Sequence, residues 1–288
     1  MTSVFHTNTA ESMLNRRVED LEVLRRADET LMAKRGYVVE MPEKGESVVA
    51  CLSGGLDSVC NLEVLMGEFG LNVYPFFINR KQTNYRWEKK AKDFFEKYFL
   101  SKYPDLMHEI IEIDLETPAE IYNDDLRNLK SLTDKFPYRH DVAYPARNPL
   151  IFLAGMEYAY SLQAKGINPK TIFGTFMKSD NLYHSSLTTS RLLNLLMCQI
   201  TGDWEFQFIS IPIEREFGNC YDKDVYVKYC IEKGVPLEHS RSCVSADEIQ
   251  CGKCPACWDR RHAFIVNGIK DSTPYQYPWT ETPPYPVI

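Results

Sequence analysis

Short apolar runs and longer segments with helical periodicity alternate along most of the chain. The apolar runs have the length of buried strands and lie at residues 48–52, 73–78, 110–113, 171–174 and 206–211. The helical segments lie at residues 59–69, 85–103, 148–163, 188–200 and 223–233. This alternation predicts an α/β fold with a doubly wound parallel sheet that helices cover on both faces.

Three segments fall outside this alternation. Residues 10–35 place leucine and valine side chains on one broad face, which predicts an extra amphipathic helix near the N-terminus. Residues 117–146 are rich in Asp, Asn, Pro and Tyr, and an irregular segment of that length is typical of a lid or substrate loop. The tail at 276–288 holds too many prolines for a helix or an inner strand.

Composition and charge narrow the class of protein. The 288 residues are 44% hydrophobic and 25% charged, as in ordinary soluble globular proteins. The net charge of −7 disfavours sequence-independent binding to nucleic acid. No apolar run approaches the ~20 residues that cross a bilayer, and the first residues lack the basic-then-apolar layout of a secretion signal. We therefore expect a cytoplasmic protein with no membrane partner.

A glycine pair stands where the first apolar run meets the next helical segment, in the string Ser53-Gly54-Gly55-Leu56-Asp57-Ser58. Consecutive glycines let the backbone approach an anion without an intervening Cβ, and a following helix N-terminus adds converging N–H groups. The string therefore predicts a binding site for the phosphates of ATP, with Ser53 and Ser58 as hydroxyl donors. Asp57 is expected to orient Mg²⁺ or to cap the helix. The alternative is a plain glycine turn that Asp57 or Ser58 caps.

The nine cysteines are unevenly spread, and four of them lie within fifteen residues: Cys243, Cys251, Cys254 and Cys257. Such crowding argues for a reducing compartment and a metal site instead of a disulfide framework. Four thiolates complete a tetrahedral Zn²⁺ shell and leave no position for water, so the predicted zinc is structural. An iron–sulfur cluster is the main competing interpretation.

The string SGGLDS resembles the signature of the PP-loop (N-type) ATP pyrophosphatases, which cleave ATP between its α and β phosphates. Together with the cysteine knuckle it is similar to the 7-cyano-7-deazaguanine synthases, the QueC family, from about residue 47 to about residue 275. Further landmarks follow in family order: RNPLIFL at 147–153, GTFMKSDNLYHSS at 174–186, Lys223, GVPL with a following SC, CGKCPAC, Arg260 and DSTPY.

The resemblance implies a PP-loop fold and an ATP-consuming ligase. Members of the family adenylate the carboxylate of 7-carboxy-7-deazaguanine, and ammonia displaces AMP to give an amide, which a second ATP converts to the nitrile. It implies that Asp57, Arg147 and Lys223 serve the reaction, Arg147 and Lys223 by neutralising phosphate or carboxylate charge. It also implies that the substrate is bound by Lys178, Asp180, Tyr183 and Arg260. The alternatives are a loop cap for Asp180 and a surface charge for Arg147.

The chain departs from the family pattern at Tyr183-His184-Ser185-Ser186, where the family segment usually reads YPDC. An acidic side chain and a thiol are missing there, which puts nitrile formation in doubt. QueC-like proteins also occur in bacterial antiviral gene islands. A specialised paralogue that conjugates the acyl group to a protein amine, or to another macromolecular amine, is therefore a second hypothesis. A third is a non-catalytic module that keeps nucleotide binding.

We expect four regions: an N-terminal helical extension at 1–46, a PP-loop domain at 47–240, a zinc-binding segment at 241–275 and the tail at 276–288. The extension and the tail are extra relative to the family, so docking on a partner protein is one hypothesis for them. Packing on the chain's own core is the other. The family also makes a homodimer an expectation.

Overall fold

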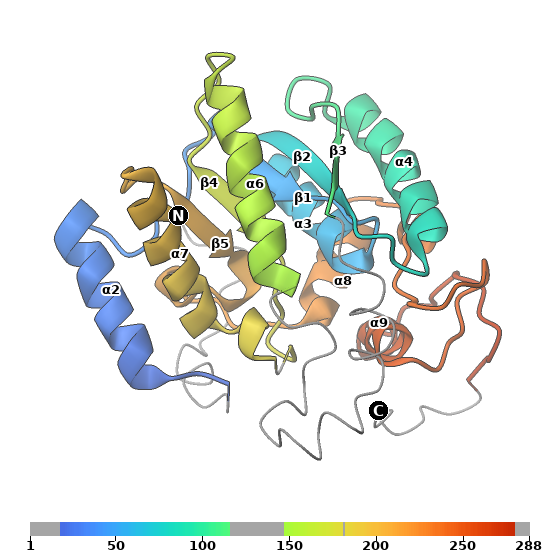
Figure 1. Cartoon of the computed structure of the whole chain (residues 1–288). Coiled ribbons are helices and arrows are strands. Elements are labelled where there is room, and N and C mark those ends of the chain that lie inside the picture. The colour runs from blue at the N-terminus through green and yellow to red at the C-terminus, as the bar shows by residue number, and fades with distance from the viewer. Residues whose placement is uncertain (1–17, 116–146, 181, 280–288) are drawn as a thin grey trace. The chain divides into compact units, whose positions relative to one another are not determined.

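The computed structural model describes residues 18–115, 147–180 and 182–279 (Figure 1). Five strands form a sheet in the order β3-β2-β1-β4-β5, and both strand pairs with a known register are parallel. The predicted α/β fold with a parallel sheet is therefore confirmed. The chain divides into two compact units, Met1–Pro42 with Asp114–Cys220 and Glu43–Ile113 with Tyr221–Ile288, here called the first and the second unit.

The second unit begins with a β-α-β-α-β run. It comprises β1 (Ser47–Cys51), α3 (Leu56–Gly67), β2 (Asn72–Asn79), α4 (Tyr85–Lys102) and β3 (Ile111–Asp114). Strand β1 pairs with β2 from Ser47 opposite Asn72 to Cys51 opposite Phe76. Almost every side chain of α3 is buried, so this helix is a core element whose N-terminus is held rigidly at the end of β1.

A buried carboxylate connects α3 to α4. Glu63 has no exposed surface, and it accepts hydrogen bonds from Lys102 Nζ at 3.0 Å and Tyr103 Oη at 2.7 Å. Burial of an unpaired carboxylate would cost several kcal/mol, and the hydrogen bonds from these two donors offset that cost for Glu63. The result is a fixed spacing between the two helices that follow β1 and β2.

The C-terminal part of the second unit packs against α3. Helix α8 (Lys223–Glu232) contacts α3 and α9 (Pro255–Val266), and the short helix η6 (Leu237–His239) lies between α8 and α9 in the chain. Tyr226 Oη donates to the buried Asn61 Oδ1 at 3.1 Å, which fixes the first turns of α8 on α3. Lys223 is thereby held near the start of α3.

The first unit contains the remaining strands and their helices. They are α6 (Arg147–Gln163), β4 (Thr171–Gly174), η3 (Tyr183–Ser185), α7 (Leu187–Thr201), β5 (Gln207–Ser210), η4 (Ile211–Ile213) and η5 (Arg215–Phe217). Strands β4 and β5 are buried along their whole length and pair from Thr171 opposite Gln207 to Gly174 opposite Ser210.

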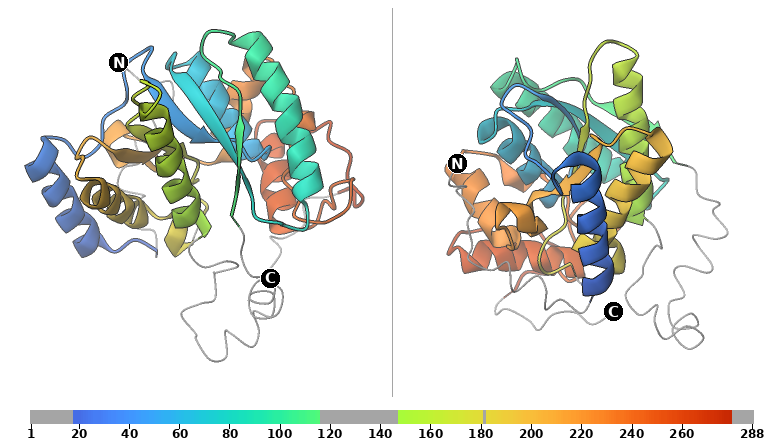
Figure 2. Two further views of the ribbon diagram at one scale, coloured as in Figure 1. Left: turned by 45° about the horizontal axis from the view of Figure 1, so that its top comes forward. Right: turned by 90° about the vertical axis from the view of Figure 1, so that its left-hand side faces the viewer.

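Helix α2 (Leu21–Arg35) belongs to the N-terminal extension and lies along α7 (Figures 1 and 2). Arg191 of α7 is fully buried and donates to Asp28 of α2 at 2.8 Å and to both carboxylate oxygens of Glu214. These two carboxylates raise the pKa of Arg191 although burial alone would lower it. The described part of the extension therefore packs on the chain's own core.

In the described ranges the predicted elements match the observed ones within a few residues, apart from one helix that was missed. The N-terminal helix begins at Leu21, and residues 10–17 of its predicted range lie outside the described residues. The loop predicted at 117–146 lies outside them too. Helix α9 was not predicted, because the cysteines and Pro255 hide its periodicity. No helix in the described ranges has both the length and the apolar character needed to cross a bilayer.

Candidate functional site

The glycine pair forms a turn that only glycine can make. Gly54 has φ +76°, and a Cβ there would lie 2.7 Å from the carbonyl oxygen of Glu88 and 2.8 Å from the amide nitrogen of Lys92. Both contacts are with the backbone of α4, so the clash could not be relieved by moving a side chain. The loop therefore sits tightly between β1 and α4.

Hydrogen bonds between the two serines stabilise the loop from within. Ser53 Oγ lies 3.0 Å from Ser58 Oγ, and Ser58 Oγ donates to the carbonyl oxygen of Gly55 at 3.0 Å. The Ser53 N–H donates to Ser58 Oγ at 3.2 Å. The two predicted hydroxyl donors thus hold the loop's shape, and their hydroxyl protons can turn toward an anion.

The N-terminus of α3 is open. Its N-cap residue is Gly55, and no side chain caps it, so neither Asp57 nor Ser58 takes the capping position that the alternative interpretation gives them. The first N–H groups of an α-helix have no partner within the helix. Uncapped amides at the end of a buried strand are the arrangement that binds phosphate groups in many nucleotide sites.

Asp57 and Lys223 meet beside this open helix end. Lys223 Nζ donates to Asp57 Oδ2 at 2.8 Å and lies 3.9 Å from Asp259 Oδ2. Asp57 Oδ1 is buried and accepts no hydrogen bond within the described part of the chain. A buried carboxylate oxygen with a free lone pair is a hard donor that suits Mg²⁺. The second unit thus brings Asp57, Lys223 and the glycine loop together.

The four clustered cysteines form a second site in the same unit. Their sulfur atoms all lie within 4.8 Å of one another, with Cys251 Sγ and Cys257 Sγ 4.0 Å apart. Thiolates around one tetrahedral ion with bonds of about 2.3 Å are separated by about 3.8 Å. The space therefore fits a single ion, because a cluster of several iron atoms would hold the sulfurs farther apart.

Backbone N–H groups point at these sulfurs. Cys243 Sγ accepts from the N–H of Cys251 at 3.2 Å and of Ser245 at 3.4 Å, and Cys251 Sγ accepts from the N–H of Cys254 at 3.4 Å. Such N–H···S bonds stabilise thiolates and orient metal ligands. The knuckle is thus prepared for a cation before one binds.

Arg241 and Arg260 hold the knuckle to the rest of the unit. Arg241 donates to the carbonyl oxygens of Cys243, Ser245, Asp247 and Glu248, and its own N–H donates to the carbonyl of Gly54 at 2.8 Å. Arg260 is fully buried and donates to Ser240, Leu237, Asp271 and Thr273. This satisfied environment favours a structural part for Arg260, and its predicted contact with substrate stays a prediction.

The first residues of the tail also pack on the knuckle. The Tyr277 N–H donates to the carbonyl of Cys251 at 3.2 Å, and Trp279 Nε1 donates to that of Gly252 at 2.8 Å. The Arg261 guanidinium stacks on Trp279 at 3.9 Å. Residues 276–279 therefore pack on the chain's own core, while 280–288 lie outside the described residues.

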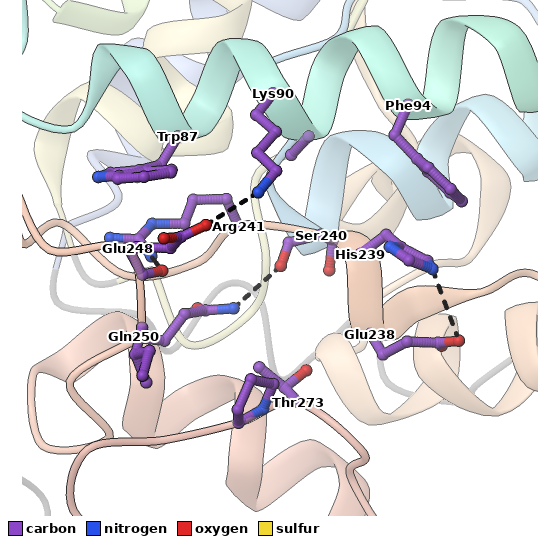
Figure 3. A pocket seen from close by; sticks show the side chains of 13 residues that line it. Trp87, Lys90, Phe94, Glu238, His239, Ser240, Arg241, Glu248, Gln250 and Thr273 are labelled. Atoms are coloured by element: carbon purple, nitrogen blue, oxygen red, sulfur yellow. Dashed lines mark hydrogen bonds and ion pairs between the residues drawn. The ribbon is translucent and has the colours of Figure 1, made fainter.

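A cavity of ≈ 550 Å³ lies between α4 and the segments around η6 and the knuckle (Figure 3). Aromatic side chains occupy two parts of its wall, with Trp87 on one side and Phe94, stacked on His239 at 3.9 Å, on the other. The Lys90–Glu248 ion pair of 2.9 Å crosses its rim. Two of its lining residues, Ala91 and Arg241, also lie next to Gly54, so the cavity adjoins the glycine loop. Sequence reasoning did not find it, because its residues come from distant parts of the chain.

In the first unit, Arg147 and Asn148 begin α6 beside the segment that departs from the family pattern. Asn148 Nδ2 donates to Ser185 Oγ at 2.8 Å and to the carbonyl of His184 at 3.4 Å. Burial, and to a smaller extent the positive charge of Arg147, lower the pKa of His184 to about 4. The imidazole is therefore neutral at physiological pH.

Glu19 of the N-terminal extension binds the start of α7. Its carboxylate accepts from the N–H of Leu187 at 3.0 Å and from the N–H of Thr188 at 2.8 Å. Ser186 is the N-cap and accepts from the N–H of Thr189 at 2.9 Å. A carboxylate at a helix N-terminus is stabilised by the helix dipole. No sequence signal identified Glu19, because its partners lie 168 and 169 residues away.

The predicted substrate residues of the first unit lie in a turn and in η3. Asp180 Oδ2 accepts from the N–H of Met177 at 2.9 Å, which is the loop bond that the alternative interpretation expects. Lys178 is half-buried, and Tyr183 is 53% exposed. Their contact with substrate stays a prediction.

Comparison with known proteins gives one family. The model of the family described as "Queuosine biosynthesis protein QueC" matches residues 47–268. A "7-cyano-7-deazaguanine synthase" of Rickettsia bellii is 27% identical over 240 residues, which cover 80% of this chain and 98% of that protein. The "7-cyano-7-deazaguanine synthase 2" of Sulfurisphaera tokodaii is 25% identical over 252 residues, 82% of this chain. That of Saccharolobus solfataricus is 32% identical over 135 residues, 46% of this chain.

The matches differ in how much of the relative they include. The alignments span 26% of the Saccharolobus protein and 49% of the Sulfurisphaera protein. Among solved structures, the NH3-dependent NAD synthetase of Campylobacter jejuni aligns over 75% of this chain and 85% of its own, with a TM-score of 0.27 and 18% identity.

Proposed function

The chain belongs to the QueC family, and on that premise we propose that it adenylates the carboxylate of 7-carboxy-7-deazaguanine, or of a close analogue, and transfers the acyl group to an amine. The observation that carries the proposal is the uncapped start of α3 behind Gly54 and Gly55, with Asp57 and Lys223 beside it. With ammonia as the amine, transfer gives the amide, and a second ATP-dependent step then converts the amide to the nitrile.

The glycine loop and the two basic residues have separate parts in this scheme. The N–H groups of residues 54–58 bind the β and γ phosphates, which leave together as diphosphate when the substrate carboxylate attacks the α phosphorus. Lys223 adds positive charge as the negative charge of the leaving group grows. AMP is a far better leaving group than the oxide of a carboxylate, so the amine can then displace it. For Arg147, in the first unit, we keep the part that the family resemblance implies, which is to neutralise phosphate or carboxylate charge.

The two cations of the scheme use the donors described above. Asp57 Oδ1 and the phosphate oxygens would hold Mg²⁺, which neutralises phosphate charge when bound. Cys243, Cys251, Cys254 and Cys257 would hold Zn²⁺ in a closed four-sulfur shell that supports the fold and takes no part in the reaction.

An exchange assay tests the first half of the scheme. The purified protein is incubated with ATP, Mg²⁺, labelled diphosphate and 7-carboxy-7-deazaguanine, and labelled ATP is measured with and without the acid. We expect exchange that depends on the acid. Exchange without the acid would contradict the proposal. No exchange with any deazaguanine acid would contradict it too, and would favour the non-catalytic nucleotide-binding module.

The altered segment at 183–186 favours a second candidate, in which the amine belongs to a protein or another macromolecule. Product analysis by mass spectrometry separates the two. With ammonia as the acceptor, appearance of amide and nitrile supports the QueC reaction. Acid-dependent AMP formation without nitrile, together with a mass increase on a protein, supports conjugation.

A further inference from the structure

The carbonyl group of Gly54 is bound from outside the glycine loop. It accepts a hydrogen bond of 2.8 Å from the main-chain N–H of Arg241. The peptide plane that contains this carbonyl also contains the N–H of Gly55, which donates to Ser53 Oγ at 3.3 Å. Because the plane is rigid, the bond from Arg241 fixes the direction of that N–H as well. Arg241 therefore helps to set the shape of the loop, although it is distant in the sequence.

The side chain of Arg241 is held by the cysteine knuckle. Arg241 is 5% exposed, and its guanidinium donates hydrogen bonds of 2.7–3.1 Å to four main-chain carbonyl oxygens, those of Cys243, Ser245, Asp247 and Glu248. Figure 3 shows Arg241 beside Glu248 in the wall of the cavity. All four carbonyls belong to the segment 243–251, whose two end residues are the first two cysteines of the cluster. The guanidinium thus binds this segment to the residue that holds Gly54.

The main chain on both sides of Arg241 is fixed by Gln250, which precedes the second cysteine of the cluster. Gln250 Oε1 accepts from the N–H of Ser242 at 3.1 Å and of Cys243 at 3.0 Å. Its Nε2 donates to the carbonyl of Ser240 at 3.0 Å. Gln250 is itself buried, so the position of the Arg241 N–H depends on the knuckle through the backbone as well as through the side chain.

Asn84 makes a second connection from the knuckle to the glycine loop. It is buried at the start of α4, and its Nδ2 donates to the carbonyl of Cys243 at 3.1 Å and to Glu88 Oε1 at 2.9 Å. The carbonyl oxygen of Glu88 is the atom that leaves no room for a Cβ at Gly54. The carbonyl of Cys243 is therefore bonded to both neighbours of the loop, Arg241 and the first turn of α4.

A metal ion on the four sulfurs would close the segment 243–251, because both of its ends are ligands. A guanidinium has its donors in a rigid planar fork, so it can bind four carbonyls at once only where they converge. Closure of the segment by the ion keeps these carbonyls together. Release of the ion would let them separate, and Arg241 would lose the partners that hold it against Gly54.

We propose that Arg241 is a positioning residue of the glycine loop, and that the metal-loaded knuckle sets through Arg241 how tightly the loop binds a diphosphate group. This inference rests on the proposed function, in which the β and γ phosphates of ATP bind to the loop. The knuckle acts on the geometry of the loop and not on the reacting atoms. It thereby links metal content to nucleotide affinity within the second unit.

The test compares two arginines that both hold the knuckle. Arg241 contacts the glycine loop, whereas Arg261 donates to the carbonyl of Tyr277 at 2.8 Å and stacks on Trp279. Binding of diphosphate and of AMP to the metal-loaded full-length protein is measured by calorimetry with Mg²⁺. We expect Arg241→Lys to weaken diphosphate binding at least about fivefold, since one ammonium cannot replace the fork. AMP binding in this variant, and both ligands in Arg261→Lys, should stay within about twofold of wild type.

The AMP measurement separates positioning from a general loss of structure. Equal weakening of diphosphate and AMP binding in Arg241→Lys, with a lowered melting temperature, would overturn the inference. Unchanged diphosphate binding in this variant would overturn it as well. If Arg241→Lys does not fold, Asn84→Ala decides, because it removes the other connection and should weaken diphosphate binding in the same selective way.

Metal removal by a chelator tests the link to the knuckle. We expect weaker diphosphate binding in the metal-free wild type, recovery when the metal is restored, and a clearly smaller change in Arg241→Lys. An equal change in the two proteins would mean that metal and Arg241 act independently, which overturns the inference. If the metal-free protein is unfolded, the comparison of the two arginine variants decides. A wild type that binds no diphosphate would overturn the proposed function itself, whereas normal binding in both wild type and Arg241→Lys would overturn this inference alone.

Discussion

The glycine loop of the second unit and the 183–186 segment of the first unit differ in how their polar groups are satisfied. In the loop, the serines bond each other, Asp57 meets Lys223, and the amides of α3 stay open for an anion. In the segment, Ser185 bonds to Asn148 and Ser186 caps α7, whereas the buried Nε2 of His184 has no hydrogen-bond partner in the described part of the chain. The loop keeps the family string, whereas the segment departs from it.

This difference suggests that activation and transfer are separately adjustable. In the proposed function diphosphate binds to the glycine loop, whose backbone tolerates no Cβ at Gly54 and so admits little variation. The second candidate function connects the choice of acceptor with the 183–186 segment, whose side chains lie outside the glycine loop and can change without altering its backbone. The following predictions test this separation.

Loss of the Asp57 carboxylate should have the largest effect. We expect Asp57→Asn to reduce acid-dependent diphosphate exchange by roughly 10²–10³-fold, since both the pair with Lys223 and a donor to Mg²⁺ are weakened. The melting temperature should change little, because the carboxylate is partly exposed. Asp259→Asn, 3.9 Å from the same lysine, is the matched control and should retain most activity. Wild-type exchange in Asp57→Asn would contradict the role of the loop.

Removal of a thiol from the knuckle should act on stability. We expect Cys254→Ser to lose the bound metal and to unfold at lower temperature, since metal binding free energy contributes to folding. Metal content by mass spectrometry and a thermal melt measure both effects. Cys51→Ser, outside the cluster, is the control. A Cys254→Ser protein with full zinc content would rule out the four-sulfur shell.

Acidification should destabilise the first unit through His184. The pKa of this imidazole falls from 6.5 to about 4 on folding, because it is buried and lies near Arg147. As the pH falls from 6.5 toward 4, the unfolded state takes up a proton that the folded state does not, so stability decreases by up to about 3 kcal/mol. The pH dependence of denaturant unfolding should be less steep in His184→Leu. Identical slopes in the two proteins would show that His184 is accessible to protons in the folded state.

Removal of the Glu19 carboxylate should have a smaller effect. We expect Glu19→Ala to lower the free energy of unfolding by about 1–2 kcal/mol, because two amides and a hydroxyl at the start of α7 lose their acceptor. Glu22→Ala, in an exposed ion pair on α2, is the control and should change little. Equal melting temperatures of Glu19→Ala and wild type would argue that the extension does not hold this segment.

Much of the fold was predictable from local pattern. The strand at 171–174 was placed correctly to the residue, and the helices at 85–103 and 148–163 to within one residue, because apolar length and periodicity decide burial. Helix α9 was missed because four of its twelve residues are Pro, Cys, Trp or His, which obscure the helical periodicity. Its first turn also contains Cys257, one of the four clustered cysteines. For the site, contiguous strings identified the glycine loop and the cysteines, which need no distant partner to be recognised.

The sequence by itself determined the class of fold, the glycine turn between the first strand and its helix, and the four-cysteine cluster, because each depends on residues close together in the chain. Tertiary structure alone decided that Lys223 meets Asp57, that Glu19 binds the start of α7 and that Arg241 joins the glycine loop to the knuckle. It also decided that the buried His184 Nε2 has no hydrogen-bond partner in the described part of the chain. These contacts span up to 187 positions in the sequence, as from Gly54 to Arg241. A local sequence pattern therefore does not show which polar groups will be paired once they are buried. Burial makes each pairing count, since an unpaired group costs far more inside the protein than in water.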